Sequence, residues 1–225
     1  MKKMMIALTA LALQSSFAQT VRNFQSPSQW ECIYISTGNV CEIYGYGGVN
    51  PGTSVTFPSS VYDAGVAKTY TVNQLGDGTA NVFTANNGAN TITQINVPPT
   101  VYQINPYAFS NLTVCTQINS GSAYIAPNAF PPNLQSATVG GNIGNSAFEG
   151  QQNLTSVTLQ DGVRTIGSRA FANCKRLYRI RIPRTVSYIA PDAFVGSGVK
   201  NVTVYRGQYP KSIKNLFTNT QELSQ

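Results

Sequence analysis

Residues 177–194 read LYRIRIPRTVSYIAPDAF, and the last six positions of this stretch, Ile-x-x-x-Ala-Phe, recur along the chain. The pattern occurs five times, at residues 104–109, 125–130, 143–148, 166–171 and 189–194. The phenylalanines that end successive copies are 21, 18, 23 and 23 residues apart. A repeat of this length is typical of proteins built from stacked coils, in which each unit forms one turn of a solenoid.

The first half of each unit is predicted to be a short β-strand. Apolar residues alternate there with polar ones, as in residues 157–159 (VTL), 180–182 (IRI) and 202–204 (VTV). Such alternation is typical of a strand with one buried face. Because no single coil can bury that face alone, we expect neighbouring coils to stack and their strands to form a parallel sheet.

The second half of each unit is predicted to contain a one-turn helix. The residue two positions after each Ile suits the first turn of a helix: Pro106, Pro127, Asn145, Ser168 and Pro191. In four copies the second residue past the Phe tolerates the left-handed conformation that closes a helix: Asn111, Gly150, Asn173 and Gly196. The predicted fold class is therefore an α/β repeat solenoid with one short strand and one short helix per coil.

The repeat resembles the BspA-like leucine-rich repeats, whose coils follow L-x-x-I-x-I-P-x-x-V-x-x-I-G-x-x-A-F-x-x-C. Residues 177–194 follow this pattern almost completely, and Cys174 fills the cysteine position behind Phe171. The similarity covers about residues 41–205, and residues 55–78 resemble a degenerate first coil with an insertion at 63–68. The resemblance implies a leucine-rich repeat protein that is not an enzyme and that binds an extracellular or host protein, often in adhesion to host or neighbouring cells.

The first 18 residues resemble a secretory signal peptide. Lys2 and Lys3 precede an apolar run at residues 4–13, and residues 16–18 (SFA) form a small-x-small cleavage site. The apolar run is too short to span a membrane as a helix, and no later stretch is long and apolar enough to do so. We therefore expect cleavage near Ala18, and a secreted, extracellular or periplasmic product.

The segments on either side of the solenoid are predicted to cap it. Residues 19–46 contain two strand-like runs around residues 37–39 (TGN), which indicates an N-terminal β-hairpin cap. The solenoid is expected over residues 47–205, and residues 206–225 are expected to form a C-terminal cap and tail. Within the cap, residues 210–217 have the spacing of an amphipathic helix, whereas residues 19–29 and 218–225 are expected to be loose.

Cys32 and Cys41, on the two arms of the predicted hairpin, are a possible disulfide pair in an exported protein. The alternative is a tight turn that places Ser36 opposite Cys41 and leaves Cys32 too far along its strand to form the bridge. Cys115 and Cys174 fall at repeat positions that are predicted to be buried.

The composition excludes several classes of function. The chain of 225 residues has no histidine, which rules out Ser-His-Asp and Cys-His nucleophiles and imidazole metal sites. Its eight acidic residues are dispersed, so we predict no catalytic, cofactor or metal site. An exported hydrolase that uses Asp161 or Asp192 is the least favoured alternative.

Charge is distributed unevenly along the chain. Residues 23–163 contain six acidic residues and one lysine, whereas residues 164–214 contain eleven basic residues and one aspartate. In the strand at 180–182, inward Ile180 and Ile182 place Arg179 and Arg181 on the outer face of the sheet. The candidate ligand-binding residues are Arg179, Arg181, Lys175, Arg176, Arg184 and Arg164.

Arginine side chains bind carboxylate, sulfate and phosphate groups through paired hydrogen bonds. The basic coils therefore have two candidate ligands: an acidic protein surface, and a sulfated glycan or other polyanionic carbohydrate. The alternative is that the basic residues form a solvated face that binds no ligand. Nucleic acid is the partner class least favoured, because the chain has no nucleic-acid motif and aromatic residues rarely alternate with the basic ones. The sequence leaves the oligomeric state open.

Overall fold

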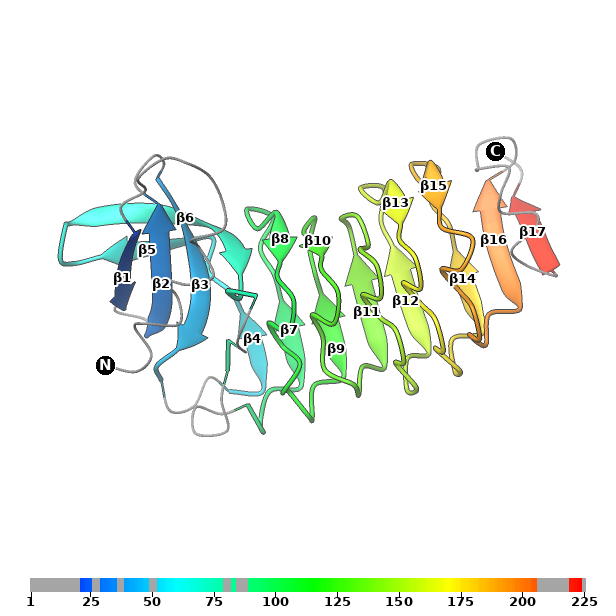
Figure 1. The fold of residues 1–225 in the computed structure, drawn as a ribbon, viewed down its shortest axis with the longest axis horizontal. Coiled ribbons are helices and arrows are strands. Elements are labelled where there is room, and N and C mark those ends of the chain that lie inside the picture. The colour runs from blue at the N-terminus through cyan, green and yellow to red at the C-terminus, as the bar shows by residue number, and fades with distance from the viewer. Residues whose placement is uncertain are drawn as a thin grey trace.

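The computed structural model describes residues 21–25, 29–35, 39–48, 52–78, 82–83, 89–205 and 219–223. The predicted signal peptide at residues 1–18 and the predicted helix at 210–217 lie outside these residues. The chain forms a row of stacked coils that advances along one axis (Figure 1). The described residues contain strands and turns but no helix, and hence no helix that could cross a membrane.

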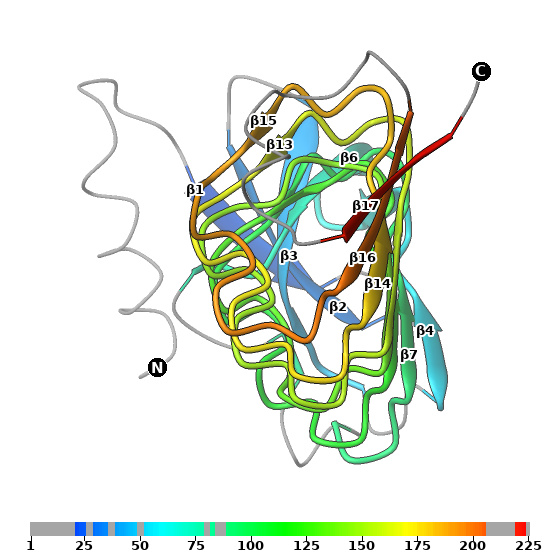
Figure 2. The same ribbon diagram turned by 90° about the vertical axis from the view of Figure 1, so that its right-hand side faces the viewer.

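One wall of the solenoid is formed by one strand from each coil and is called here the long-strand sheet. Its strands are β4 (Ser54–Thr56), β7 (Gln94–Asn96), β9 (Gln117–Asn119), β11 (Ser136–Val139), β12 (Ser156–Leu159), β14 (Arg179–Arg181) and β16 (Asn201–Tyr205). All paired strands are parallel, and Figure 2 shows β4, β7, β14 and β16 on the same side of the coil. The predicted parallel sheet is thus confirmed.

A second wall contains shorter strands that the sequence analysis does not predict, and is called here the short-strand sheet. In this wall β8 (Gln103–Ile104), β10 (Tyr124–Ile125), β13 (Thr165–Ile166) and β15 (Tyr188–Ile189) each contain the Ile of one repeat motif. Ile143, the motif Ile of the remaining copy, bridges Ile125 and Ile166. Each Ile side chain is buried, and its backbone pairs with that of a neighbouring coil.

The predicted one-turn helices are not found, because turns occupy their positions. In four of the five copies the residue directly before the Ala has a positive φ: Tyr107 (61°), Asn128 (54°), Ser146 (53°) and Arg169 (55°). A left-handed residue cannot continue a right-handed helix, so the chain turns before a helix forms. The left-handed residue predicted two positions past the Phe is present at Gly150, Asn173 and Gly196 but not at Asn111.

The motif phenylalanines stack on one another inside the wall of turns. Successive ring centroids lie 6.4, 5.1, 5.1 and 5.3 Å apart from Phe109 through Phe130, Phe148 and Phe171 to Phe194. All five side chains are buried. Phe57 extends the row toward the N-terminus, with its ring 5.6 Å from that of Phe109 and 4.9 Å from that of Trp30.

At the N-terminal end, the short-strand sheet continues into a group of longer strands. These are β1 (Val21–Gln25), β2 (Trp30–Ile35), β3 (Val40–Tyr46), β5 (Ser60–Asp63) and β6 (Lys68–Leu75). The arms β2 and β3 of the predicted hairpin pair antiparallel, β3 then pairs in parallel with β6, and β5 and β6 form the insertion as a second antiparallel pair. That this group caps the solenoid remains a prediction.

Two segments that were expected to be loose form strands instead. Residues 21–25 pair with β2 as β1, and residues 219–223 form β17 (Asn219–Leu223), which pairs in parallel with β16. In both cases the segment pairs with the outermost strand and becomes the new edge strand of its sheet.

Candidate functional site

The outer face of the long-strand sheet carries two columns of exposed or partly exposed polar side chains. The strand registers align these columns from β4 to β12, and again from β14 to β16. Uncharged members of the columns are Ser54, Thr56, Gln94, Asn96, Gln117, Asn119, Ser136, Thr138, Ser156, Thr158, Asn201 and Thr203. In β14 the same two positions are Arg179 and Arg181, so a pair of positive charges interrupts a neutral face.

Both arginines of β14 are exposed, on either side of buried Ile180, as strand alternation predicts. Lys175 and Arg176 are exposed in the turn before this strand, and Arg184 is exposed just after it. These five basic residues thus belong to one coil. Arg164 does not join them, because it directly precedes β13 and its carbonyl accepts hydrogen bonds from the next coil within the short-strand sheet.

The long-strand sheet is interrupted beside this basic coil. It consists of two separate hydrogen-bonded groups, β4 to β12 and β14 to β17, with no pairing between β12 and β14. At the other junctions, one backbone carbonyl per coil accepts hydrogen bonds from two successive amides of the next coil. These carbonyls belong to Thr53, Thr93, Thr116, Gln135 and Tyr178. At the corresponding place between described residues, Thr155 accepts no bond from the amides of Tyr178 and Arg179. This interruption is called here the seam.

On their other sides the coils remain in contact across the seam. β13 pairs with β15, and Phe171 stacks on Phe194. The two coils are therefore joined at the short-strand sheet and at the wall of turns, whereas at the long-strand sheet β12 and β14 lie side by side without backbone pairing.

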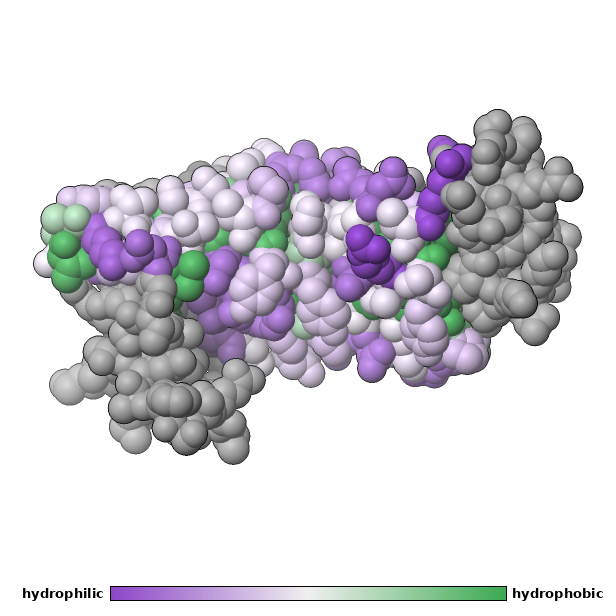
Figure 3. Space-filling model, turned by 90° about the horizontal axis from the view of Figure 1, so that it is seen from above, coloured by the Kyte–Doolittle hydropathy of each residue, from purple (hydrophilic) through white to green (hydrophobic). Residues whose placement is uncertain are grey.

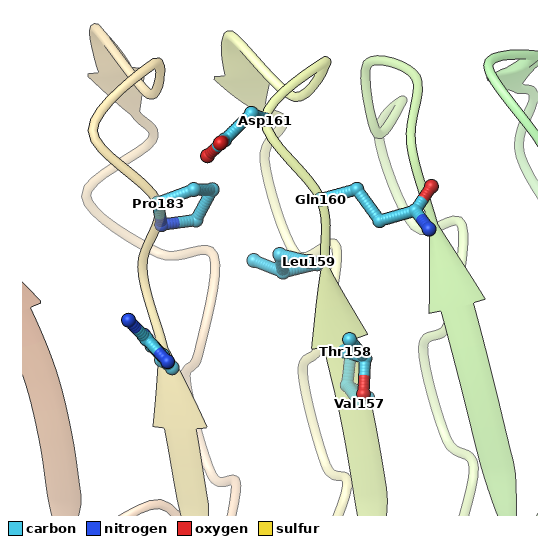
Figure 4. A pocket seen from close by; sticks show the side chains of 7 residues that line it. Val157, Thr158, Leu159, Gln160, Asp161 and Pro183 are labelled. Atoms are coloured by element: carbon cyan, nitrogen blue, oxygen red, sulfur yellow. The ribbon is translucent and has the colours of Figure 1, made fainter.

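A cavity of about 550 Å³ lies at the seam. Its lining residues are Val157, Thr158, Leu159, Gln160, Asp161, Arg181 and Pro183. Val157 and Leu159 are 8% and 9% exposed, against 3% and 0% for their neighbours Ala137 and Val139 in β11, which is paired on both sides. Figure 4 shows Leu159 and Asp161 pointing toward Pro183 in the next coil, whereas Gln160 points away from it.

Sequence reasoning did not predict the seam, although one signal for it exists. The Gln160 amide donates a 2.8 Å hydrogen bond to the Val139 carbonyl, and one repeat later this position is Pro183, which has no amide hydrogen. The signal is weak, since Pro98 occupies the same repeat position two residues after β7, and β4 and β7 remain paired.

The two aspartates considered for hydrolysis do not lie together. Asp161 lines the seam on the sheet side, whereas Asp192 lies in the wall of turns and accepts a 2.7 Å hydrogen bond from the Ser168 hydroxyl. Among the described residues, no group of three or more His, Cys, Asp or Glu side chains could hold a metal ion.

All four cysteines are buried free thiols in the structure. Burial raises the pKa of Cys115 to about 11 and that of Cys174 to about 12, which makes both unreactive. In the hairpin, Tyr34 and not Ser36 lies opposite Cys41, so the register with Ser36 is wrong. Cys32 lies diagonally across from Cys41, and a hydrogen bond with Cys41, followed by burial, raises the pKa of the Cys32 thiol.

The surface seen from above in Figure 3 is mainly polar, with apolar side chains in small separate groups. Several tyrosine side chains are exposed. They include Tyr102, which directly precedes β8 of the short-strand sheet, and Tyr188, which lies in β15 of that sheet. A broad apolar patch, which would indicate a hydrophobic docking site, is not seen on this face.

Comparison with protein families agrees with this geometry. The model of the BspA type leucine-rich repeat region matches residues 81–140 and 141–225, with six copies. This chain belongs to the BspA-type leucine-rich repeat family. Membership suggests a protein-interaction role and argues against enzymatic activity. A search of curated proteins found no match.

Solved structures support the same fold. A leucine-rich cell surface protein from Faecalibacterium prausnitzii is similar at 22% identity and a TM-score of 0.53, covering 84% of this chain and 56% of that protein. The pneumococcal vaccine antigen PcpA is similar at 16% identity and a TM-score of 0.54, covering 83% of this chain and 51% of the antigen. The BspA-type chain thus spans about half the length of these two proteins, and identities this low show the fold alone.

Proposed function

We propose that this BspA-type chain is a secreted or surface-associated interaction protein that binds a protein partner through the outer face of the long-strand sheet. Adhesion to host or neighbouring cells is its proposed biological use. The observation that carries the proposal is the pair Arg179 and Arg181, both exposed within an otherwise neutral polar face.

The chemistry of this face suits a folded partner with a local acidic patch. A guanidinium group forms paired hydrogen bonds with a carboxylate, and hydrogen bonds to charged groups contribute about 1.5–3 kcal/mol each. The uncharged columns add hydrogen bonds without repelling either sign of charge. Arg179 and Arg181 would therefore fix where the acidic patch docks, and the columns from β4 to β12 would contact the surface around it.

The test is a binding measurement with a partner captured from host-cell or matrix extracts and then purified. Three proteins are compared after their thermal unfolding has been matched: the mature chain, Arg179→Ser/Arg181→Ser, and the charge-matched control Lys68→Ser/Arg164→Ser, whose sites lie outside the long-strand sheet. We expect the first variant to bind at least about tenfold more weakly, since 1.4 kcal/mol corresponds to a factor of ten, and the control to bind normally. Equal weakening of both variants would contradict the proposal.

The alternative ligand, a sulfated glycan or other polyanion bound by the basic coil, is distinguished by salt. Binding that depends mainly on released counterions weakens steeply as salt rises, whereas a protein interface with apolar and neutral polar contacts weakens less. Retention on a heparin column that disappears at moderate salt, together with no captured protein, would favour the polyanion.

A further inference from the structure

We propose that a cavity in the wall of turns, between the coils of Tyr107 and Glu149, binds one neutral sugar unit of a glycan. None of the residues that line this cavity belongs to the long-strand sheet. The proposal therefore does not rest on the protein partner proposed above, and either of the two can fail without the other.

The first argument is that the repeat is locally shortened at this place. The turn between the motif Phe and the following buried Leu comprises residues 131–133 here and residues 149–153 in the next coil. In the longer turn, the amide of Leu154 donates to the carbonyl of Gln151 within the turn. The amide of Leu134 instead donates to the side chain of Gln151 from the next coil, at 3.3 Å. The shortened turn thus leaves a recess beside a longer one.

The second argument is that the backbone of the two coils is less closely joined at this recess. At three junctions the amide of the motif Phe donates to the carbonyl of the motif Ala in the next coil: Phe109 to Ala129, Phe148 to Ala170 and Phe171 to Ala193. At the fourth junction, also between described residues, Phe130 donates no such bond to Ala147. The Gln151 side chain, 4% exposed, donates a 2.7 Å hydrogen bond to the Pro131 carbonyl and so closes the base of the recess.

A cavity of about 240 Å³ occupies the recess, and three successive coils line it. Tyr107, Asn128 and Ser146 occupy the same repeat position in these coils, and each has a left-handed backbone, with φ of 61°, 54° and 53°. The shared conformation places the three side chains in a column along one side of the cavity. The volume is below the range of about 300–1,000 Å³ that drug-sized ligands need, so the cavity suits a single sugar unit.

The third argument is that the accessible lining has the chemistry that a sugar needs. The Tyr107 side chain is 48% exposed, and Pro132 is also exposed. The electron-rich face of an aromatic ring packs favourably on the C–H groups of a pyranose ring. The amide of exposed Asn128 carries a donor and an acceptor side by side, which matches two adjacent hydroxyl groups of a sugar.

The fourth argument is that the cavity favours a ligand without charge. Among the described residues that line it, only Glu149 is charged. Arg169 forms a salt bridge with this carboxylate, with its Nε donating at 3.0 Å, and Ser146 donates a further hydrogen bond to it. An anion would meet the Glu149 carboxylate, and a cation would compete with Arg169. A sugar hydroxyl can donate to a remaining lone pair of the carboxylate without disturbing the pair.

The test is titration of the mature chain with the methyl glycosides of galactose, mannose and N-acetylglucosamine, followed by amide chemical shifts. We expect at least one of the three to bind at millimolar concentration. The shift changes of the unchanged protein should centre on Tyr107, Asn128 and Glu149, which is a readout that needs no variant.

Variants then separate the roles of the side chains. Tyr107→Ala should weaken binding about tenfold, whereas Tyr107→Phe keeps the ring face and should bind normally. Asn128→Gly, which suits the left-handed backbone, should weaken binding several-fold. The matched control is Tyr188→Ala, because this tyrosine is 53% exposed but lies in the short-strand sheet, and it should bind as the unchanged protein does.

Any of three results would overturn the proposal. These are no shift changes with any of the three glycosides, binding that Tyr107→Ala leaves unchanged, and equal weakening by Tyr107→Ala and Tyr188→Ala. Tighter binding of galacturonic acid than of galactose would also contradict the neutral ligand class. Arg179→Ser/Arg181→Ser should bind the sugar normally, so that loss of the protein partner and loss of the sugar are measured independently.

Discussion

The rings of Phe171 and Phe194 stack with their centroids 5.3 Å apart and their planes 12° apart, across the same coil junction at which β12 and β14 are unpaired. One wall of this junction is thus tightly packed, while in another the two strands lie side by side without backbone pairing. Phe171 also stacks on Phe148 at 5.1 Å, so its ring lies between two coils.

Replacing Phe171 with Ala should therefore destabilise the fold severely. The change removes a fully buried ring that joins two coils, and such changes cost about 3–5 kcal/mol through lost burial and the remaining cavity. Urea unfolding checks this value. Tyr178→Ala, in the following coil, serves as the control because its side chain is 56% exposed, and it should change stability by no more than about 0.5 kcal/mol.

Gln151 is predicted to be important for stability through its amide group. Its Nε2 donates a 2.7 Å hydrogen bond to the Pro131 carbonyl, and its Oε1 accepts a 3.3 Å bond from the Leu134 amide. Gln151→Leu should leave these buried backbone groups unsatisfied and cost about 1–3 kcal/mol. Gln152→Leu, at an exposed position, should cost much less in the same unfolding experiment, and equal losses would contradict this account.

Stability should also depend on pH through Glu42. Burial, followed by the charge of Asp77, raises the pKa of this carboxyl from 4.5 to about 8, and its Oε1 has no hydrogen-bond partner among the residues that the structure describes. Because the folded state holds the proton more tightly, its stability should fall as pH rises from about 4.5 to 8, by roughly 1–4 kcal/mol.

Glu42→Gln should remove this loss, which unfolding curves recorded at several pH values would measure. Glu149 provides a control of opposite sign, because hydrogen bonds from Arg169 and then Ser146 lower its pKa. The contribution of Glu149 to the stability of the fold is present at pH values above the pKa of its carboxyl in the unfolded chain, and it is lost as the pH falls. A flat difference between the wild type and Glu42→Gln would contradict the assignment.

Cys32 and Cys41 are predicted to form a disulfide when the protein is oxidised. Their diagonal position across β2 and β3 and the hydrogen bond between their thiols bring the two sulfur atoms together. Closing the loop between them should stabilise the fold by about 2–4 kcal/mol. Mass spectrometry after mild oxidation should find the bridge in a peptide that links residues 32 and 41, and persistence of both free thiols would exclude it.

The repeat pattern predicts the long-strand sheet and the buried phenylalanine row because both depend on local periodicity. Ile180 between Arg179 and Arg181 is a sufficient signal for one buried and two exposed side chains. The turns around Ser146 and Arg169 were not predicted, because a positive φ at these residue types has no clear sequence signature.

The seam was not predicted for a different reason. It depends on how two whole coils meet, and a proline at the position of Pro183 is compatible with a paired strand elsewhere in the chain, at Pro98. The two-residue strands of the short-strand sheet are likewise too short to give an alternation pattern of their own.

Photo-cross-linking to the purified partner tests the central proposal most directly. A photoreactive residue is placed at Asn119 on the outer face of the long-strand sheet, at Tyr188 in the short-strand sheet, or at Val195 in the wall of turns, all three of which are exposed. If the partner covers the outer face of the long-strand sheet, the position at Asn119 should cross-link and the other two should not. Cross-links from Tyr188 or Val195, with none from Asn119, would contradict the proposed binding face.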